Sequence, residues 1–390
     1  LVTDFYYPWI AGPAELIRNL ATGLTDRGHE ISVLAPSPTG RAYQENDNGF
    51  AVHRAASIQL PAGYQLRVST RPFRDASRWL RATRPDVVHV HHPFPLCAAA
   101  ILAGRALRIP VVATNHTIPA CTLFGIRRSF VYGPAEFAFS HWLTWLLSRT
   151  DAVATPTNTA AAELRDLRYR GHVEVISNGV DTMRFQPGQS DRLRERLGLD
   201  GRPVVLYTGR LDAEKQMDVW LRSAARVLKT VPVQFVIGGE GTDRRRLELL
   251  AAELGLRGSV LFPGYLNASE LPDLYRLANV YMITSPVELQ SISLLEAIAS
   301  GLPVVASRAG ALPELVREGW NGYLAAAGNV DETSHALLKV LQANQAETRM
   351  MCLHSRQLAE QHGLAHTIQA YERFFSDRLQ PEISFERSPA

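Results

Sequence analysis

Short apolar runs alternate with longer amphipathic stretches along most of the chain. The runs form two series, the first at 31–36, 87–91, 110–115, 152–156 and 173–177, and the second at 203–209, 233–239, 260–265, 280–285 and 303–307. Between them, apolar residues recur every three or four positions, most clearly at 14–27, 75–83, 217–229, 244–254 and 294–300. Continuously apolar strands separated by helices predict parallel sheets that are covered on both faces.

Two such series predict an α/β protein with two tandem, Rossmann-like, doubly wound domains. The length of 390 residues fits two domains. A polar, glycine-containing stretch at 178–188 separates the series, so we expect an N-terminal domain over 1–182 and a C-terminal domain over 183–364. A last helix at about 365–380 could pack on either domain. Because doubly wound sheets bind ligands beyond the carboxyl ends of their strands, facing domains would hold a ligand in the cleft between them.

Composition and charge exclude several classes of protein. A hydrophobic content of 46% with 20% charged residues excludes a mainly disordered chain, and a net charge of +3 is too small to indicate nucleic-acid binding. The surplus of positive charge lies in residues 1–182, whose net charge is +4, whereas residues 183–390 have a net charge of −1. Cys97, Cys121 and Cys352 have no metal-binding spacing and suit a reducing compartment. The apolar run 137–147 is too short to span a bilayer. We therefore expect a cytoplasmic protein that can lie on the inner membrane face, in an oligomeric state left open.

The loop at Gly209–Lys215 is the first candidate binding site. It follows an apolar run and leads into a helix, so Arg210 and Lys215 can converge on an anion near a helix amino end. Lys215 stands out because the chain has 38 Arg but only three Lys. The alternative interpretation is a loop with two solvated cations.

Two glutamates, Glu288 and Glu296, form a second candidate site. Glu288 lies in the loop after the run 280–285, and Glu296 lies in the following helix. A loop carboxylate beside helix-start amides can bind sugar hydroxyls while the amides bind phosphate. The alternative is a solvated loop charge and a charge that complements the helix dipole.

Read in order, these segments resemble glycosyltransferase family 4. The segment 288–306 resembles the donor-site signature of that family, and so do Gly209–Lys215 before it and Gly310–Glu314 after it. Further similar segments are 176–181 at the domain junction, the Gly12 loop, 27–30 and 85–91. The similarity covers nearly the whole chain. It implies the GT-B architecture, in which two Rossmann-like domains face each other across a cleft, and retaining transfer of a hexose from a UDP- or GDP-sugar.

The resemblance implies roles for named residues. Arg210 and Lys215 would hold the donor diphosphate and stabilise its charge as the glycosidic bond breaks. Glu296 would bind the ribose, and Glu288 would lie near the donor sugar. His116 would reach the sugar from the opposite domain. The remaining donor contacts would come from Gly12 at the phosphates, from Tyr265 and Leu266 at the base, and from the backbone of Gln290, Ser291 and Ile292.

Two positions depart from the family pattern, and one motif is missing. Ala11-Gly12 stands where the family often has paired glycines, and Ser291 stands where it often has glycine. The side chain of Ser291 leaves less space than glycine would for the backbone to approach the donor. Since no Asp-x-Asp motif stands beside these residues, we expect metal-independent transfer with no cofactor.

Arginines and aromatic residues in the first half suggest where an acceptor binds. Arg74, Arg78 and Arg81 share one face of a predicted helix, and Arg127 and Arg128 precede an aromatic segment. Such a surface suits an anionic membrane. The alternatives are a solvated helix face and, for the aromatic segment up to 147, a part of the core.

The expected function is therefore glycosyl transfer to a membrane lipid. The segments 58–61 and 111–117 look most like lipid-acting members of the family, notably diacylglycerol glucosyltransferases and phosphatidylinositol mannosyltransferases. Transfer to a soluble sugar or small metabolite, a nucleotide-sugar epimerase and an inactive binder remain alternatives. A Rossmann oxidoreductase is poorly supported, because Gly238-Gly-Glu-Gly241 is not the GxGxxG pattern.

Overall fold

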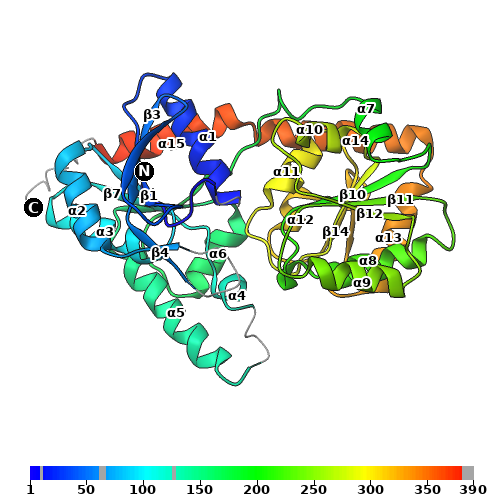
Figure 1. Ribbon diagram of the computed structural model, residues 1–390, viewed down its shortest axis with the longest axis horizontal. Helices are drawn as coiled ribbons and strands as arrows, with labels where there is room; N and C mark the ends of the chain where they lie inside the picture. The colour runs from blue at the N-terminus through cyan, green and yellow to red at the C-terminus, as the bar shows by residue number, and fades with distance from the viewer. Residues whose placement is uncertain (9–11, 61–66, 125–128, 380–390) are drawn as a thin grey trace, which may run out of the picture.

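The computed structural model describes residues 1–8, 12–60, 67–124 and 129–379 of the chain. Figure 1 shows two α/β domains beside each other, each with a twisted sheet in the middle and helices outside it. Two largely parallel sheets of this kind confirm the predicted pair of Rossmann-like domains. We call the domain with the earlier strands the first domain and the other the second domain.

The sheet of the first domain joins two groups of strands, ordered β2-β3-β1 and β6-β7-β8-β9. Val2 connects the groups, because its backbone bridges to Leu34 on one side and to Val90 on the other. All neighbouring strands pair in parallel except β2 and β3. The strands are β1 (Ser32–Pro36), β2 (Tyr43–Asp47), β3 (Phe50–Ala55), β6 (Val88–Val90), β7 (Val111–Thr114), β8 (Ala152–Thr155) and β9 (Val173–Val175).

A β-hairpin that the sequence analysis did not predict extends one edge of this sheet. β2 and β3 are joined at Asn48 and Gly49, whose φ angles are 49° and 91°. A type I′ hairpin turn requires positive φ angles at both central residues, and Asn-Gly is a favoured pair for it. A separate antiparallel pair, β4 (Ser57–Gln59) with β5 (Arg67–Ser69), follows the hairpin.

Helices cover both faces of the first sheet, because alternate residues of each strand point to opposite sides. In β7, Val111 and Ala113 belong to the core under α2, α3 and α5, whereas Val112 belongs to the core under α1 and α15. The helices of this domain are α1 (Gly12–Asp26), α2 (Pro72–Thr83), α3 (Pro95–Ala106), α4 (Pro119–Thr122), α5 (Tyr132–Leu147), α6 (Asn158–Asp166) and α15 (Leu364–Leu379).

The second sheet has six parallel strands in the order β12-β11-β10-β13-β14-β15. Numbered within the domain, this is the order 3-2-1-4-5-6 of dinucleotide-binding folds, with the switch point between β10 and β13. The strands are β10 (Val204–Thr208), β11 (Gln234–Gly238), β12 (Val260–Gly264), β13 (Val280–Ile283), β14 (Val304–Ser307) and β15 (Gly322–Ala325). The helices are α7 (Asp191–Arg196), α8 (Met217–Val227), α9 (Arg244–Glu253), α10 (Leu271–Arg276), α11 (Ile292–Ala299), α12 (Leu312–Leu315), α13 (Val330–Leu341) and α14 (Gln345–Gln361).

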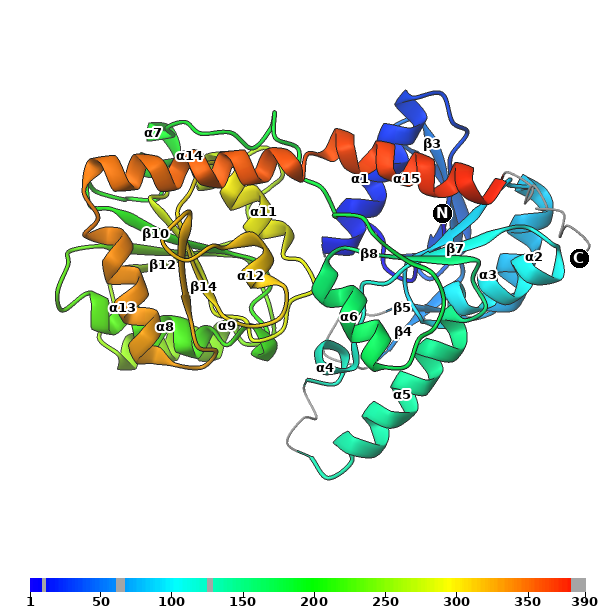
Figure 2. The ribbon, with the colours of Figure 1, turned by 180° about the vertical axis from the view of Figure 1, so that it is seen from behind.

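The backbone crosses between the domains twice. Val180 on the first crossing and Gly363 on the second form a parallel bridge, so the two segments support each other. After the second crossing, α15 continues from α14 and lies along the first domain, as Figure 2 shows from behind. Ile368, Tyr371 and Phe374 of α15 are buried against strands of the first sheet.

None of the helices in the described part of the chain combines the length and the apolar content that crossing a bilayer requires.

The burial of α15 leads to a stability prediction. Phe374 is 1% exposed, so Phe374→Ala removes a packed ring and leaves a cavity. We expect the free energy of unfolding to fall by about 3–5 kcal/mol, measured by chemical denaturation. Leu353→Ala on α14, where the side chain is 53% exposed, is the control and should cost less than about 0.5 kcal/mol. Equal losses in the two variants would contradict a core role for α15.

Candidate functional site

The loop after β10 lies against a glycine-rich loop after β11. The N–H of Gly209 donates to the carbonyl of Gly238 at 3.0 Å, and the N–H of Leu211 donates to the carbonyl of Glu240 at 2.9 Å. A Cβ atom on Gly239 would lie 1.9 Å from the carbonyl oxygen of Gly209. The Gly238–Gly241 segment does not match the GxGxxG pattern. Its glycines instead allow the loop after β11 to pack against the loop after β10.

Two carboxylates hold the guanidinium group of Arg210. It forms ion pairs at 2.6 Å with both Asp212 and Glu214, while its side chain remains 37% exposed. Asp212 is fixed in turn, since its Oδ1 accepts hydrogen bonds from the backbone N–H and the hydroxyl of Thr242, at 3.0 and 2.9 Å. Asp212 and Glu214 lie within the loop that the sequence indicated, but nothing in the sequence marked them as partners of Arg210.

Lys215 and Glu288 form an ion pair at the carboxyl edge of the second sheet. Lys215 Nζ lies 2.7 Å from Glu288 Oε1, and the two side chains are only 17% and 11% exposed. Burial lowers the pKa of Lys215, but the Glu288 carboxylate outweighs it and raises the pKa above its usual value. Lys215 is therefore charged at physiological pH. The two candidate sites that the sequence suggested separately are one site in the structure.

Gly310 fixes the backbone of Glu288. The N–H of Ala311 donates to the Glu288 carbonyl at 2.8 Å, and a Cβ atom on Gly310 would lie 2.5 Å from that oxygen. Gly310 also has a φ angle of 50°, which favours glycine. The 310–314 segment thus places the loop that carries Glu288.

Glu296 is buried in α11 beside a tyrosine from α10. Its Oε2 accepts a hydrogen bond from the hydroxyl of Tyr275 at 2.6 Å, and the same hydroxyl lies 2.6 Å from Thr208 Oγ1. Burial raises the pKa of Glu296 to about 7. The carboxyl group therefore changes its charge near neutral pH. The sequence carried no sign of its tyrosine partner.

The amino end of α11 meets the amino end of α1 from the other domain. Ser291 is the N-cap of α11, and its hydroxyl accepts the N–H of Leu294 at 3.2 Å. Its φ angle of −79° suits any residue, so serine fits here without strain. Ile292, the next residue, packs against Gly12, where a Cβ atom would lie 3.2 Å from the Ile292 side chain.

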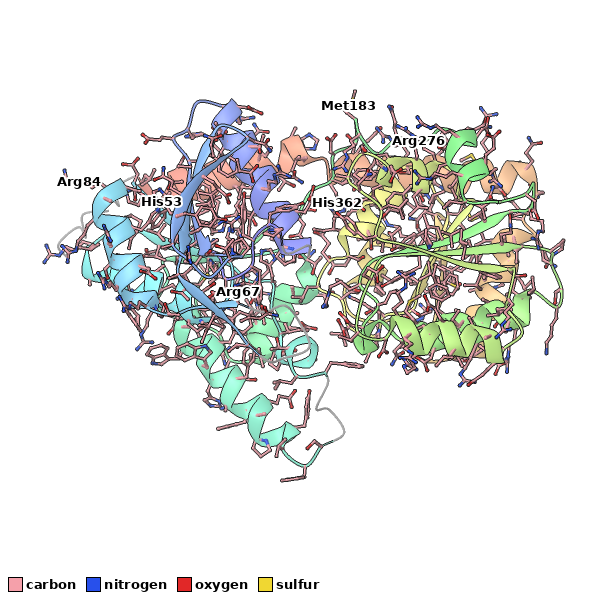
Figure 3. The ribbon with its side chains drawn as sticks, in the orientation of Figure 1. His53, Arg67, Arg84, Met183, Arg276 and His362 are labelled. Carbon is pink, nitrogen blue, oxygen red and sulfur yellow. The ribbon has the colours of Figure 1, made fainter. Side chains whose placement is uncertain are left out.

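Gln290 directs its side chain to the domain junction. Its Oε1 accepts the N–H of Asn178 at 2.7 Å, and its Nε2 donates to Ser177 Oγ at 3.1 Å. Ser177 Oγ also lies 2.9 Å from Nδ1 of His362, which Figure 3 labels between the domains. The side chain of Gln290 is thus a junction contact, which leaves its backbone for the predicted donor contact.

Two further contacts fasten the second domain to α6 of the first. The hydroxyl of Thr157 donates to the Leu289 carbonyl at 2.8 Å. The carboxylate of Glu314 accepts the backbone N–H groups of Asn158 and Thr159 at 3.2 and 2.7 Å. Glu314 thus binds the amino end of α6, a role that its place in the 310–314 segment did not reveal.

His116 follows β7, is half-buried and lies against the buried histidines His91 and His92. Its Nε2 lies 3.3 Å from Nδ1 of His91, and the two rings are stacked. Burial lowers the pKa of His116 to about 4 and also lowers the pKa of His89, His91 and His92. The imidazole of His116 is therefore neutral at physiological pH and can act as a hydrogen-bond partner rather than as a cation.

Among the remaining predicted residues, Leu266 lies beside the Gly238–Gly241 loop, where a Cβ atom on Gly238 would be 3.7 Å from its side chain, and the arginines lie farther away. Tyr265 and Leu266 follow β12. The side chain of Tyr265 is 54% exposed, whereas that of Leu266 is buried in the core of the second domain. Arg74, Arg78 and Arg81 are exposed on α2, at the far side of the first domain in Figure 1. Arg127 and Arg128 lie outside the described residues. Across the described ranges, no three His, Cys, Asp or Glu side chains are placed to hold a metal ion.

Two glycosyltransferase family models match the two domains of this chain. The family model described as Glycosyltransferase Family 4 matches residues 10–184, and the model described as Glycosyl transferases group 1 matches residues 189–354. An alpha-monoglucosyldiacylglycerol synthase of Streptococcus pneumoniae is 28% identical over 78% of this chain and 70% of its own length. A GDP-mannose-dependent alpha-mannosyltransferase of Mycobacterium tuberculosis is 31% identical over 85% of this chain and 84% of its own length.

A solved structure shows the same fold. The Anabaena protein Alr3699/HepE, crystallised in complex with UDP and glucose, superposes with a TM-score of 0.78. It is 19% identical, and the match covers 96% of this chain and 98% of that one. The two facing Rossmann-like domains are thus the GT-B architecture. The family models together span both domains, and one relative is 31% identical along most of its length. This chain is therefore an enzyme of glycosyltransferase family 4.

Proposed function

We propose that this glycosyltransferase moves a hexose from a UDP- or GDP-sugar to a hydroxyl group of a membrane lipid such as diacylglycerol or phosphatidylinositol, with retention of configuration. The observation that carries the proposal is the buried pair of Lys215 with Glu288, beside Arg210, at the carboxyl edge of the second sheet. Ligands of doubly wound sheets bind at this edge, next to the switch point.

Two kinds of positive charge support a diphosphate site here. Arg210 and Lys215 supply two cations, which pair with Asp212, Glu214 and Glu288 in this structure. The amino ends of α1 and α11, which meet at Gly12 and Ile292, supply the positive ends of two helix dipoles. Glu288 Oε1 pairs with Lys215, which leaves Oε2 to accept a hydroxyl of the donor sugar. The donor would therefore lie with its phosphates at the cations and its sugar at Glu288.

In the proposed reaction, the bond from the anomeric carbon to the phosphate oxygen breaks, and a bond from that carbon to the acceptor oxygen forms on the same face. The acceptor's proton passes to the departing phosphate oxygen. Arg210 and Lys215 stabilise the charge that develops on the diphosphate. Since these side chains can take the part of a divalent ion, we propose that the transfer needs no metal.

The lipid acceptor is supported by two observations. One relative is named a monoglucosyldiacylglycerol synthase. Arg74, Arg78 and Arg81 are exposed on α2, and none of them forms an ion pair within the described part of the chain, so this helix presents charge to an anionic surface. A soluble acceptor is the second candidate, so transfer to free sugars is measured in parallel with the lipid assay below.

The first test removes a cation of the diphosphate site. We expect Lys215→Ala to lower kcat for transfer from UDP-glucose or GDP-mannose to detergent-dispersed diacylglycerol or phosphatidylinositol by about 100-fold or more. Arg210→Ala, at the more exposed position, serves as a second variant, because Lys215→Ala leaves Glu288 unpaired and can reduce stability. Lys229→Ala, an exposed lysine at the end of α8, is the control. Wild-type transfer by the Arg210 and Lys215 variants, or transfer to free sugars alone, would contradict the proposal.

The second test concerns stereochemistry and metal. Proton NMR of the product should show an α-linked sugar from an α-linked donor, because attack and departure share one face of the ring. EDTA in the same assay should leave the rate unchanged. A β-linked product would exclude the same-face reaction, and loss of activity in EDTA that is restored by a divalent ion would exclude metal-independent transfer.

The third test uses the pKa of Glu296. The carboxylate form of Glu296 can accept hydrogen bonds from two ribose hydroxyls. Because the pKa of Glu296 is raised to about 7, this form is lost by protonation as the pH falls through neutrality. We expect the KM for the donor to rise about tenfold between pH 8 and pH 6. Glu296→Gln should have a high KM that does not vary over this range. A wild-type KM that is constant with pH would count against ribose binding by Glu296.

A further inference from the structure

The first half of α5 is an uncovered aromatic surface. The buried residues of this helix are Leu143, Leu146 and Leu147, all in its last turns. Phe137 is 66% exposed, and Phe130, just before the helix, is 94% exposed. Figures 1 and 2 show α5 projecting from the first domain with its amino end farthest out. The interpretation of 137–147 as a core segment is therefore wrong for its first part.

The aromatic surface continues toward the base of the helix. Trp142 and Trp145, 40% and 41% exposed, stack with ring centroids 5.3 Å apart. The guanidinium of Arg149 lies 3.7 Å from the centroid of the Trp145 ring. Glu136 is the one charged residue between Tyr132 and Leu147. The carboxyl end of α5 therefore carries exposed aromatic rings beside a cation, the guanidinium of Arg149, and we call this place the border of the aromatic surface.

A cavity of about 510 Å³ opens beside this border, between the last turns of α5 and the loop after α6. Arg168 and Arg170 line it, both are exposed, and neither forms an ion pair within the described residues. Asp151 is the one carboxylate in the described lining, and its Oδ2 already accepts the N–H of Val111 at 2.7 Å. The remaining lining residues are His141, Thr144, Trp145, Ser148, Thr150, Tyr169, Gly171 and His172.

We propose that α5 and this cavity form a docking site for an anionic lipid bilayer. The rings of Phe137 and Trp145 enter the interfacial layer, and the cavity takes the phosphate of an anionic phospholipid headgroup between Arg168 and Arg170. Trp142, whose Nε1 donates to the Pro93 carbonyl at 2.7 Å, holds the helix on the first domain. Aromatic side chains favour the boundary between headgroups and acyl chains. Guanidinium groups match phosphate oxygens and are attracted to anionic lipids.

The inference rests on the proposed lipid acceptor, because docking would bring the first domain to the surface that carries it. The combination of features favours a bilayer over a protein partner. A protein interface would require a shaped apolar surface, whereas here the rings project on a helix end and a cationic cavity of headgroup size lies at their border. Self-association is tested below as the competing outcome.

The test is flotation of the full chain with vesicles of phosphatidylcholine alone or mixed with phosphatidylglycerol, without donor. We expect the wild-type protein to bind the mixed vesicles. Phe137→Ser combined with Trp145→Ser should weaken binding to both compositions about tenfold or more. Arg168→Glu combined with Arg170→Glu should lower binding of the mixed vesicles to the level of phosphatidylcholine alone.

Matched controls come from α9 of the second domain. Leu249→Ser replaces a side chain that is 59% exposed, and Arg245→Glu reverses an exposed charge, so both should leave flotation unchanged. Thermal unfolding verifies that all variants fold. Unchanged flotation of the α5 and cavity variants would overturn the inference. So would a dimer in solution that the α5 variants dissociate, because the rings would then bind a second copy.

The transfer assay separates this inference from the proposed function. With detergent-dispersed acceptor, the α5 and cavity variants should retain wild-type kcat, because no bilayer is needed there. Lost flotation with intact transfer therefore supports the docking site. Intact flotation of the wild type without any transfer to lipid would instead contradict the proposed acceptor and leave the docking site standing.

Discussion

The buried ion pair between Lys215 and Glu288 is the interaction on which the candidate site depends. Each charge would be costly in this position without the other, because removing one partner leaves an uncompensated buried charge. The backbone on both sides is accordingly fixed. Close packing at Gly239 holds the loop of Lys215, and close packing at Gly310 holds the loop of Glu288. The glycines therefore act on the chemistry indirectly, by bringing two loops from distant parts of the sequence to one point.

The same loops also connect the two domains. Leu289 and Gln290, directly after Glu288, contact Thr157, Ser177 and Asn178 of the first domain and the junction. A change in the angle between the domains would therefore move the backbone next to Glu288. The position of the first domain and the geometry of the donor site are coupled through these few hydrogen bonds, so donor contacts and acceptor placement are not independent in this fold.

The sequence predicted the fold better than it predicted the partners within the site. Continuously apolar runs identify buried parallel strands, and the functional side chains follow these strands, so both are visible locally. The contacts of Asp212 with Thr242 and of Glu296 with Tyr275 join residues far apart in the chain, and nothing local announces them. The hairpin at Asn48 and Gly49 was missed although its turn pair is a recognisable signal, because β2 has a single apolar residue, Tyr43, and therefore shows no alternation of apolar and polar positions.

The aromatic segment of α5 shows where sequence patterns are ambiguous in principle. An apolar helix can have the same composition whether its aromatic rings pack in a protein core or are exposed. In α5, the structure distinguishes the buried last turns from the exposed first half by the burial of three leucines. The last turns of α5 adjoin arginines, at the edge of a first domain that carries the surplus positive charge of the chain. The second domain has the buried charge pair and no net charge, since residues 183–364 contain 20 basic and 20 acidic residues. The proposed donor site and the proposed lipid surface thus lie on different domains, which the hydrogen bonds of Leu289 and Gln290 connect.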